Sequence, residues 1–123
     1  MDRQTRQALI DRVSKEPFAG ILNIRLTEVD EGYAVCEMNY DGSELDNIHG
    51  TAHGGAIFSL IDEAFEISSN SHGPTAVALN VNVSYVKPAI KGSNLRATSS
   101  EINKQARTAL YQMLALAPTR TSP

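Results

Sequence analysis

Apolar side chains recur along this chain with two periods, and the change of period separates expected helices from expected strands. A spacing of three to four residues marks residues 2–15 and, more strongly, residues 54–69. Pro17 ends the first of these segments. In the second, the positions expected to be buried are Ile57, Leu60, Ile61, Ala64, Phe65 and Ser68. The opposite flank, expected to face solvent, carries Ser59, Asp62, Glu63 and Glu66.

Alternation of apolar and polar residues predicts strands on both sides of the long helix. Residues 20–29 and 33–40 form a hairpin around a turn at 30–32. After the helix, the strongest alternation in the chain predicts a strand at 75–86. Its one apolar face carries Val77, Leu79, Val81, Val83 and Tyr85. Further strands are predicted at residues 95–102 and 108–116.

The order of these elements predicts an α+β fold in one domain. An antiparallel sheet has one buried face, and a single long apolar helix is the partner available to cover it. The expected arrangement is therefore a sheet wrapped around the helix at 54–69, with a short helix at the N-terminus. We assign residues 1–117 to this domain and expect residues 118–123 to form a frayed tail.

Composition excludes several classes of function. The formal net charge is -3 and no basic run is present, so nucleic acid is not expected as a partner. No apolar run reaches membrane-spanning length, and the first residues lack the features of a signal peptide. The single cysteine, Cys36, lies within a predicted strand and is expected to be a buried, inert thiol. We therefore expect a cytoplasmic protein.

The glycine-rich stretch at residues 47–55 leads directly into the long helix. Gly54 and Gly55 allow close backbone approach at the helix start, where several N–H groups lack partners within the helix. Such donors, with the positive end of the helix dipole, suit an anion or a developing oxyanion. Acyl chemistry is one interpretation of this pattern; a glycine-rich turn with a purely structural role is the other.

A carboxylate for this chemistry is available at Asp62, although Glu63 and Glu66 have the same claim by residue type. Asp62 lies eight residues beyond Gly54, which is about 12 Å along a helix axis. Both groups have to come within about 3 Å of one reacting carbonyl. If both act, the site must combine the helix start of one copy with Asp62 of another, and a symmetric dimer is required.

The two histidines of the loop, His49 and His53, are four residues apart. They lie in a glycine-containing loop without a third ligand at motif spacing, so no metal site is expected. His53 has three possible roles: to brace the turn, to contact a substrate carbonyl or to act as a base. Farther along the chain, basic residues in or near turns can meet the phosphates of a nucleotide-bearing thioester. These residues are Lys87, Lys91, Arg96, Lys104 and Arg107.

The run from Asn47 through His53-Gly54-Gly55 to Asp62 resembles the hotdog-fold acyl-CoA thioesterases, with the phenylacetyl-CoA thioesterase branch the most similar. Residues 82–89 and 107–111 add to the resemblance, which extends over about residues 16–113. It implies a hotdog fold, homodimers with two shared sites and often a dimer of dimers. The expected reaction is hydrolysis of an acyl-CoA, with coenzyme A as part of the substrate and no separate cofactor.

Carried over residue by residue, the resemblance assigns four catalytic positions. Asp62 matches the carboxylate that acts as base or nucleophile, and the Gly54 N–H matches the donor that polarises the thioester carbonyl. Asn47 matches the residue that orients water or substrate, and His53 has a supporting role. We assign substrate binding to Gly55, Lys87, Pro88 and Arg107.

The C-terminal part departs from the family pattern. Relatives continue after the strand at Leu110-Tyr111 with a turn and one more strand, whereas this chain continues into a Pro/Thr/Ser-rich tail. We therefore expect the last strand to be missing or altered, with a free sheet edge as the result. Two other functions stay open: an acyl-CoA-binding or assembly module without catalysis, and a dehydratase acting on hydroxyacyl thioesters.

Overall fold

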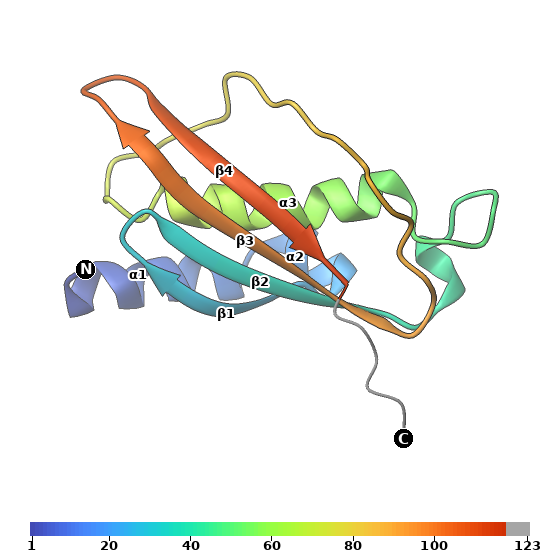
Figure 1. The fold of residues 1–123 in the computed structure, drawn as a ribbon. Helices are drawn as coiled ribbons and strands as arrows, with labels where there is room; N and C mark the ends of the chain where they lie inside the picture. Colours follow the sequence, from blue (N-terminus) through green and yellow to red (C-terminus); the bar gives the residue numbers. More distant parts are fainter. Residues whose placement is uncertain (118–123) are drawn as a thin grey trace.

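The computed structural model describes residues 1–117, so the tail predicted at 118–123 lies outside the described part of the chain. The elements are the helices α1 (Arg3–Ser14) and α2 (Pro17–Leu22), the strands β1 (Arg25–Asp30) and β2 (Tyr33–Tyr40), the 3-10 helix η1 (Ser43–Leu45), the helix α3 (Gly54–Ser69), and the strands β3 (Ser93–Lys104) and β4 (Ala109–Leu116) (Figure 1). No helix in this described part is long and apolar enough to cross a membrane.

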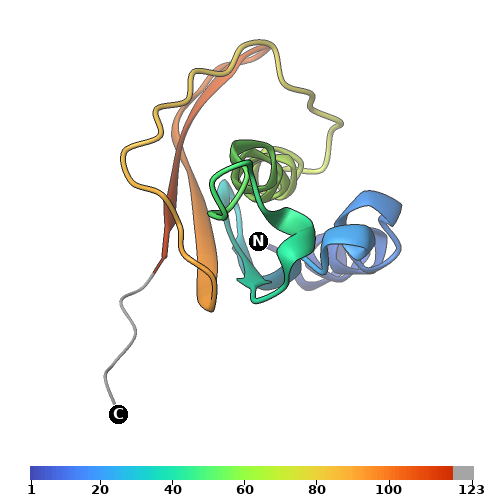
Figure 2. The same ribbon diagram turned by 90° about the vertical axis from the view of Figure 1, so that its right-hand side faces the viewer.

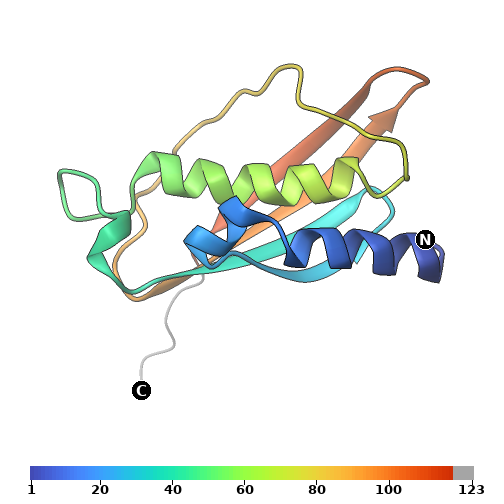
Figure 3. The ribbon, with the colours of Figure 1, turned by 180° about the vertical axis from the view of Figure 1, so that it is seen from behind.

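The four strands form one antiparallel sheet in the order β1-β2-β3-β4. The sheet curves around α3, which is seen end-on in Figure 2. From behind, α1, α2 and α3 all lie on the same face of the sheet (Figure 3). This arrangement confirms the predicted α+β class, the hairpin of β1 and β2, and the position of the long helix.

The core lies between α3 and the concave face of the sheet. From α3 it receives Ala56, Leu60, Ala64 and Ile67; from the sheet it receives Ala34, Cys36, Met38, Tyr40, Leu95 and Ala97. The alanines on both sides allow the helix to lie close to the strands, and Met38, Tyr40 and Leu60 fill the space between them. The helix that carries the candidate chemistry is thus held along its buried side.

The segment before β1 differs from the prediction, because residues 20–22 are helical rather than extended. Pro17 is the first residue of α2, where its fixed φ suits a helix and its missing N–H costs nothing. The helix ends at Asn23, which adopts the left-handed conformation with φ of 54°. The predicted strand at residues 20–29 therefore begins only at Arg25.

The predicted strand at residues 75–86 is wrong for this structure. The segment runs past α3 without joining the sheet (Figure 1), and apolar side chains such as Val77 and Leu79 stay exposed, at 84% and 91%. A strand needs a neighbouring edge for its backbone groups, and apolar alternation alone does not supply one. Within residues 1–117, the sheet ends at β4.

Between this segment and β4 lies an open groove of about 1520 Å³. Ile57, Ile61 and Phe65 of α3 line it, together with much of residues 74–89 and 104–117. These α3 side chains were predicted to be fully buried, but they are half-buried because the groove exposes one side of the helix. The groove therefore marks the place where the sheet does not cover α3.

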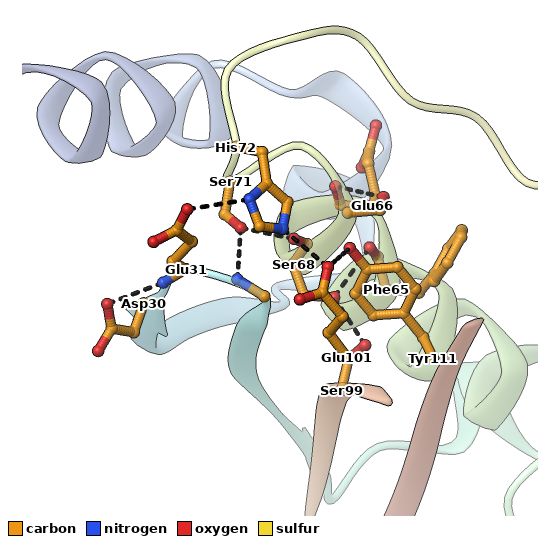
Figure 4. A network of polar contacts seen from close by, with 12 residues as sticks. Asp30, Glu31, Phe65, Glu66, Ser68, Ser71, His72, Ser99, Glu101 and Tyr111 are labelled. Atoms are coloured by element: carbon orange, nitrogen blue, oxygen red, sulfur yellow. Dashed lines mark hydrogen bonds and ion pairs between the residues drawn. The ribbon is translucent and has the colours of Figure 1, made fainter. Parts of the chain in front are cut away.

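A network of polar side chains fastens the C-terminal end of α3 to the sheet (Figure 4). The hydroxyl groups of Ser68 and Ser99 lie 2.7 Å apart in the core. Ser71 donates to the Ser68 carbonyl at 2.6 Å and accepts the Gly32 N–H at 2.7 Å. Such buried, fully paired groups define the rotation and position of the helix.

We predict that the Cys36 thiol is protected in the native protein. It is fully buried, and burial, followed by the charges of Glu63, Glu16 and Glu66, raises its pKa to about 12. At pH 8 a thiol-specific reagent should label it at least 100-fold more slowly than in denaturant, because the thiolate is the reactive form. The measurement is a labelling time course followed by mass. Comparable rates in both conditions would contradict the buried position of β2.

Candidate active site

The loop before α3 is organised by the side chain of Asn47. Its Oδ1 accepts the N–H groups of His49 at 2.8 Å and Thr51 at 3.1 Å, while its Nδ2 donates to the Thr51 hydroxyl at 2.8 Å. Gly50, with φ of +78°, completes the turn. Both ends of the Asn47 amide are thus used within the loop. Its predicted contact with water or substrate stays a prediction.

Asp46 anchors the same loop to the sheet. Its carboxylate accepts the hydroxyl of Tyr40, and Lys91 donates to it at 3.0 Å. These two hydrogen bonds hold the pKa of Asp46 below its ordinary value. A loop fixed at both Asp46 and Asn47 places the start of α3 in a defined position.

His53 is the N-cap residue of α3. Its Nδ1 accepts the Gly55 N–H at 2.8 Å, and its backbone N–H donates to the Leu45 carbonyl at 2.7 Å. An accepting Nδ1 places the single proton of a neutral imidazole on Nε2. Of the three roles considered for His53, bracing of the turn is the one that these contacts display.

The first turn of α3 leaves one backbone donor unused. The Gly55 N–H is held by His53, and the N–H groups of Ala56 and Ile57 donate to the His53 carbonyl at 2.9 and 3.2 Å. Within the described residues, the Gly54 N–H has no acceptor. Tyr85 donates to the Gly54 carbonyl at 3.1 Å, and the Cβ of any larger residue at 54 would lie 3.4 Å from its ring.

Asp62 lies on the exposed side of α3, away from the sheet. Partial burial and then the charge of Glu16 raise the pKa of this carboxyl above its ordinary value, which makes it a stronger base. Because α3 is one uninterrupted helix from Gly54 to Ser69, the separation of about 12 Å along its axis applies to the folded chain.

The three acidic residues of α3, which the sequence did not distinguish, occupy different environments. Glu66 is exposed, as expected for the solvent flank. Glu63 was predicted on that flank too, and this is wrong: it is only 5% exposed. Glu63 lies at the border of the helix face that packs against the N-terminal segment, where Glu16 is its neighbour. Asp62 therefore differs from Glu63 in being accessible.

The predicted substrate-binding residues do not converge within one chain. Lys87 and Pro88 line the groove in the segment that precedes β3, and both are exposed. Arg107 lies in the turn between β3 and β4, which projects at the same end of the molecule as the C-terminal end of α3 (Figures 1 and 3). Gly55 is at the N-terminal end of α3, and its N–H is already bonded.

A smaller pocket of about 240 Å³ lies beside His53 and Gly55. Its apolar lining comes from Phe18 and Leu22 of α2, with Leu45 and Ala56. Sequence reasoning missed it, because residues 20–22 were assigned to a strand. The available signal was the pair Phe18 and Leu22, four residues apart after a proline that favours a helix start.

Comparison with models of known protein families shows which family this chain belongs to. The Thioesterase superfamily model matches residues 49–120, which include the loop, α3 and the two last strands. This chain belongs to the Thioesterase superfamily. The resemblance to hotdog-fold thioesterases of the PaaI-like branch is confirmed by the relatives and solved structures.

Two curated relatives of this superfamily show how much of a longer protein the chain represents. It is 44% identical over 93 residues to a protein of Archaeoglobus fulgidus, covering 76% of this chain and 60% of the relative. It is 36% identical over 95 residues to acyl-coenzyme A thioesterase PaaI of Escherichia coli, covering 77% and 67%. The chain thus spans about two thirds or less of these relatives.

Solved structures of superfamily members share the fold. The PaaI protein from the phenylacetic acid degradation operon of E. coli superposes with a TM-score of 0.86 at 30% identity, covering 91% of this chain and 80% of that one. A mutant of the phenylacetic acid degradation protein PaaI of Thermus thermophilus gives 0.78 at 36% identity, covering 83% and 87%.

We predict that His53→Ala destabilises the thioesterase domain by loss of the N-cap. An N-cap hydrogen bond contributes about 1 kcal/mol, so the Tm should fall by roughly 4 °C. His53→Asp supplies another capping acceptor and should recover most of the loss. The matched control is His49→Ala in the same loop, with an unchanged Tm. Equal melting of His53→Ala and His49→Ala would contradict the capping role.

Proposed function

We propose that this chain is an acyl-CoA thioesterase whose site is shared between two copies. The Gly54 N–H of one copy and the Asp62 carboxylate of the other act on the same thioester, and the products are the free acid and coenzyme A. The observation that carries the proposal is the single free N–H in the first turn of α3, at Gly54. Membership in the superfamily and the names of the relatives support the reaction class.

The oxyanion that develops on the thioester carbonyl requires a positioned donor. The Gly54 N–H lies at the N-terminal end of a 16-residue helix, where the helix dipole adds favourable charge. The loop bonds of His53 and Asn47 hold this peptide in place before the substrate arrives. A donor that needs no reorganisation is the kind that lowers the barrier.

Asp62 supplies the second group. As a base it takes a proton from water, and the hydroxide attacks the carbonyl carbon. As a nucleophile its oxygen attacks directly and forms an anhydride, which water then hydrolyses. In both routes the C–S bond breaks and the thiolate of coenzyme A leaves and takes a proton. The raised pKa of Asp62 favours the role of base.

A pocket beside the helix start is available for the acyl group. Its apolar lining residues are Phe18, Leu22, Leu45 and Ala56, and its polar ones are Glu44, Asp46, His53 and Ser59. Its volume of about 240 Å³ accommodates one phenyl ring, since a cavity of about 150 Å³ is enough to hold benzene. This agrees with relatives named for phenylacetic acid degradation. We therefore propose arylacetyl-CoA as the preferred substrate, a homodimer as the active unit, and a dimer of dimers as the expected assembly.

The test is an assay of thiol release on a panel of acyl-CoA esters with variants of both groups. Asp62→Asn should lower kcat by at least 100-fold on every substrate, because it removes the base or nucleophile. Gly54→Pro should do the same because it removes the N–H. Proline suits the first helical position, and the extended backbone of His53 (φ -61°, ψ 136°) suits a residue before proline.

The matched control is Gly54→Ala, which keeps the N–H and adds a Cβ at ordinary contact distance from Tyr85. It should retain kcat within about threefold of the wild type. Turnover that survives Asp62→Asn and Gly54→Pro would contradict the proposal. Thermal stabilisation by CoA esters without any thiol release would instead identify a binding module.

A further inference from the structure

Three carboxylates converge beside α3, at a place that the hydrolytic chemistry does not use. Glu16 precedes α2, and Glu63 and Glu66 lie one turn apart on α3; one oxygen from each lies within 4.8 Å of the others. Glu16 is the N-cap residue of α2, yet its side chain makes no capping hydrogen bond. Its carboxylate joins the other two instead.

Glu63 provides a second and independent observation. Its side chain is only 5% exposed, and its Oε2 has no hydrogen-bond partner. A buried carboxylate oxygen without a donor is costly, and native structures retain few of them. Glu63 also contributes a carboxylate oxygen to the cluster with Glu16 and Glu66, so a partner placed between the three groups would satisfy this carboxylate.

The charges around the three glutamates narrow the identity of the missing partner. Within residues 1–117, no lysine, arginine or histidine forms an ion pair with these three glutamates. Unlike many acidic clusters, this one includes a member that solvent cannot screen. Either a shared proton or a bound cation must offset the repulsion.

We propose that Glu16, Glu63 and Glu66 bind one calcium-like divalent cation. Three carboxylate oxygens are hard ligands of the type that calcium prefers, at 2.3–2.6 Å from the ion. Two ligands of one such ion lie at most about 5 Å apart, and the three oxygens, all within 4.8 Å of one another, satisfy this condition. Water completes the coordination sphere on the exposed side, next to Glu66.

Binding at this position joins two parts of the fold. Glu16 belongs to the connection between α1 and α2, and the two other ligands belong to α3. The cation therefore fastens the N-terminal helices to α3, and its binding energy adds to the stability of the folded chain. This consequence is measurable without any substrate, so it is independent of the proposed hydrolysis.

The experiment is thermal unfolding at pH 8 of the full chain after treatment with a chelator, with and without millimolar calcium chloride. Sodium chloride at equal ionic strength is the salt control. The wild type should gain about 5 °C or more in Tm with calcium, and calorimetry should give one site per chain.

Variants distinguish this site from general salt effects. Glu63→Gln and the exposed Glu66→Gln should each reduce the calcium-dependent gain in Tm at least fivefold. Glu44→Gln, an exposed glutamate in η1, should keep the full gain. No gain in the wild type, or an equal gain in Glu66→Gln and the wild type, would overturn the proposal. Stabilisation by Glu63→Gln without any calcium effect would assign the site to a shared proton.

Discussion

The rise of an α-helix keeps Gly54 and Asp62 about 12 Å apart along α3, and no change of side-chain rotamer removes this separation. The rest of the structure maintains that geometry. Alanines pack α3 close to the sheet, and the serine network around Ser68 and Ser99 holds its C-terminal end. The Asn47 loop and the His53 cap hold its N-terminal end. A rigid helix fixed in this way keeps the two groups of the proposed site apart, and in our proposal a second copy brings them together.

On the open side of the molecule, a segment with a strong strand pattern has no neighbouring strand in the described structure with which to pair. Residues 75–86 alternate as clearly as any strand, but they stay outside the sheet, with Val77 and Leu79 exposed and Val81 and Val83 half-buried. The free edge of β4 faces the same groove. Exposed apolar walls on this scale are typical of an interaction surface.

Local patterns predicted those parts of the fold that depend on neighbours in sequence. The spacing of apolar residues at 54–69 predicted α3 with the same first and last residues as in the structure. The turn at 30–32 predicted the hairpin of β1 and β2. Two of the failures differ in kind. The helix α2 has local signals that were missed, namely Pro17 at its start and the left-handed Asn23 at its end, whereas the burial of Glu63 depends on its proximity to the distant Glu16.

The candidate site also has features that the sequence predicted and features that required the structure. The glycine-rich loop, the carboxylate and their separation were available from the sequence, because helix geometry is general. The residue pattern alone did not distinguish Gly54 from Gly55 as the donor. The family resemblance assigned Gly54, and in the structure the His53 ring accepts the Gly55 N–H. The hydrogen bonds of the Asn47 amide within its own loop likewise could not be predicted from the sequence.

The most direct test of the shared site combines two inactive chains. Asp62→Asn and Gly54→Pro, carrying different affinity tags, are co-expressed, and the mixed dimer is isolated through both tags. One of its two sites then pairs an intact Gly54 with an intact Asp62, while the other carries both lesions. The account predicts about half of the wild-type thioesterase activity per dimer. A mixed dimer as inactive as its two parents would place both groups in one copy and contradict it.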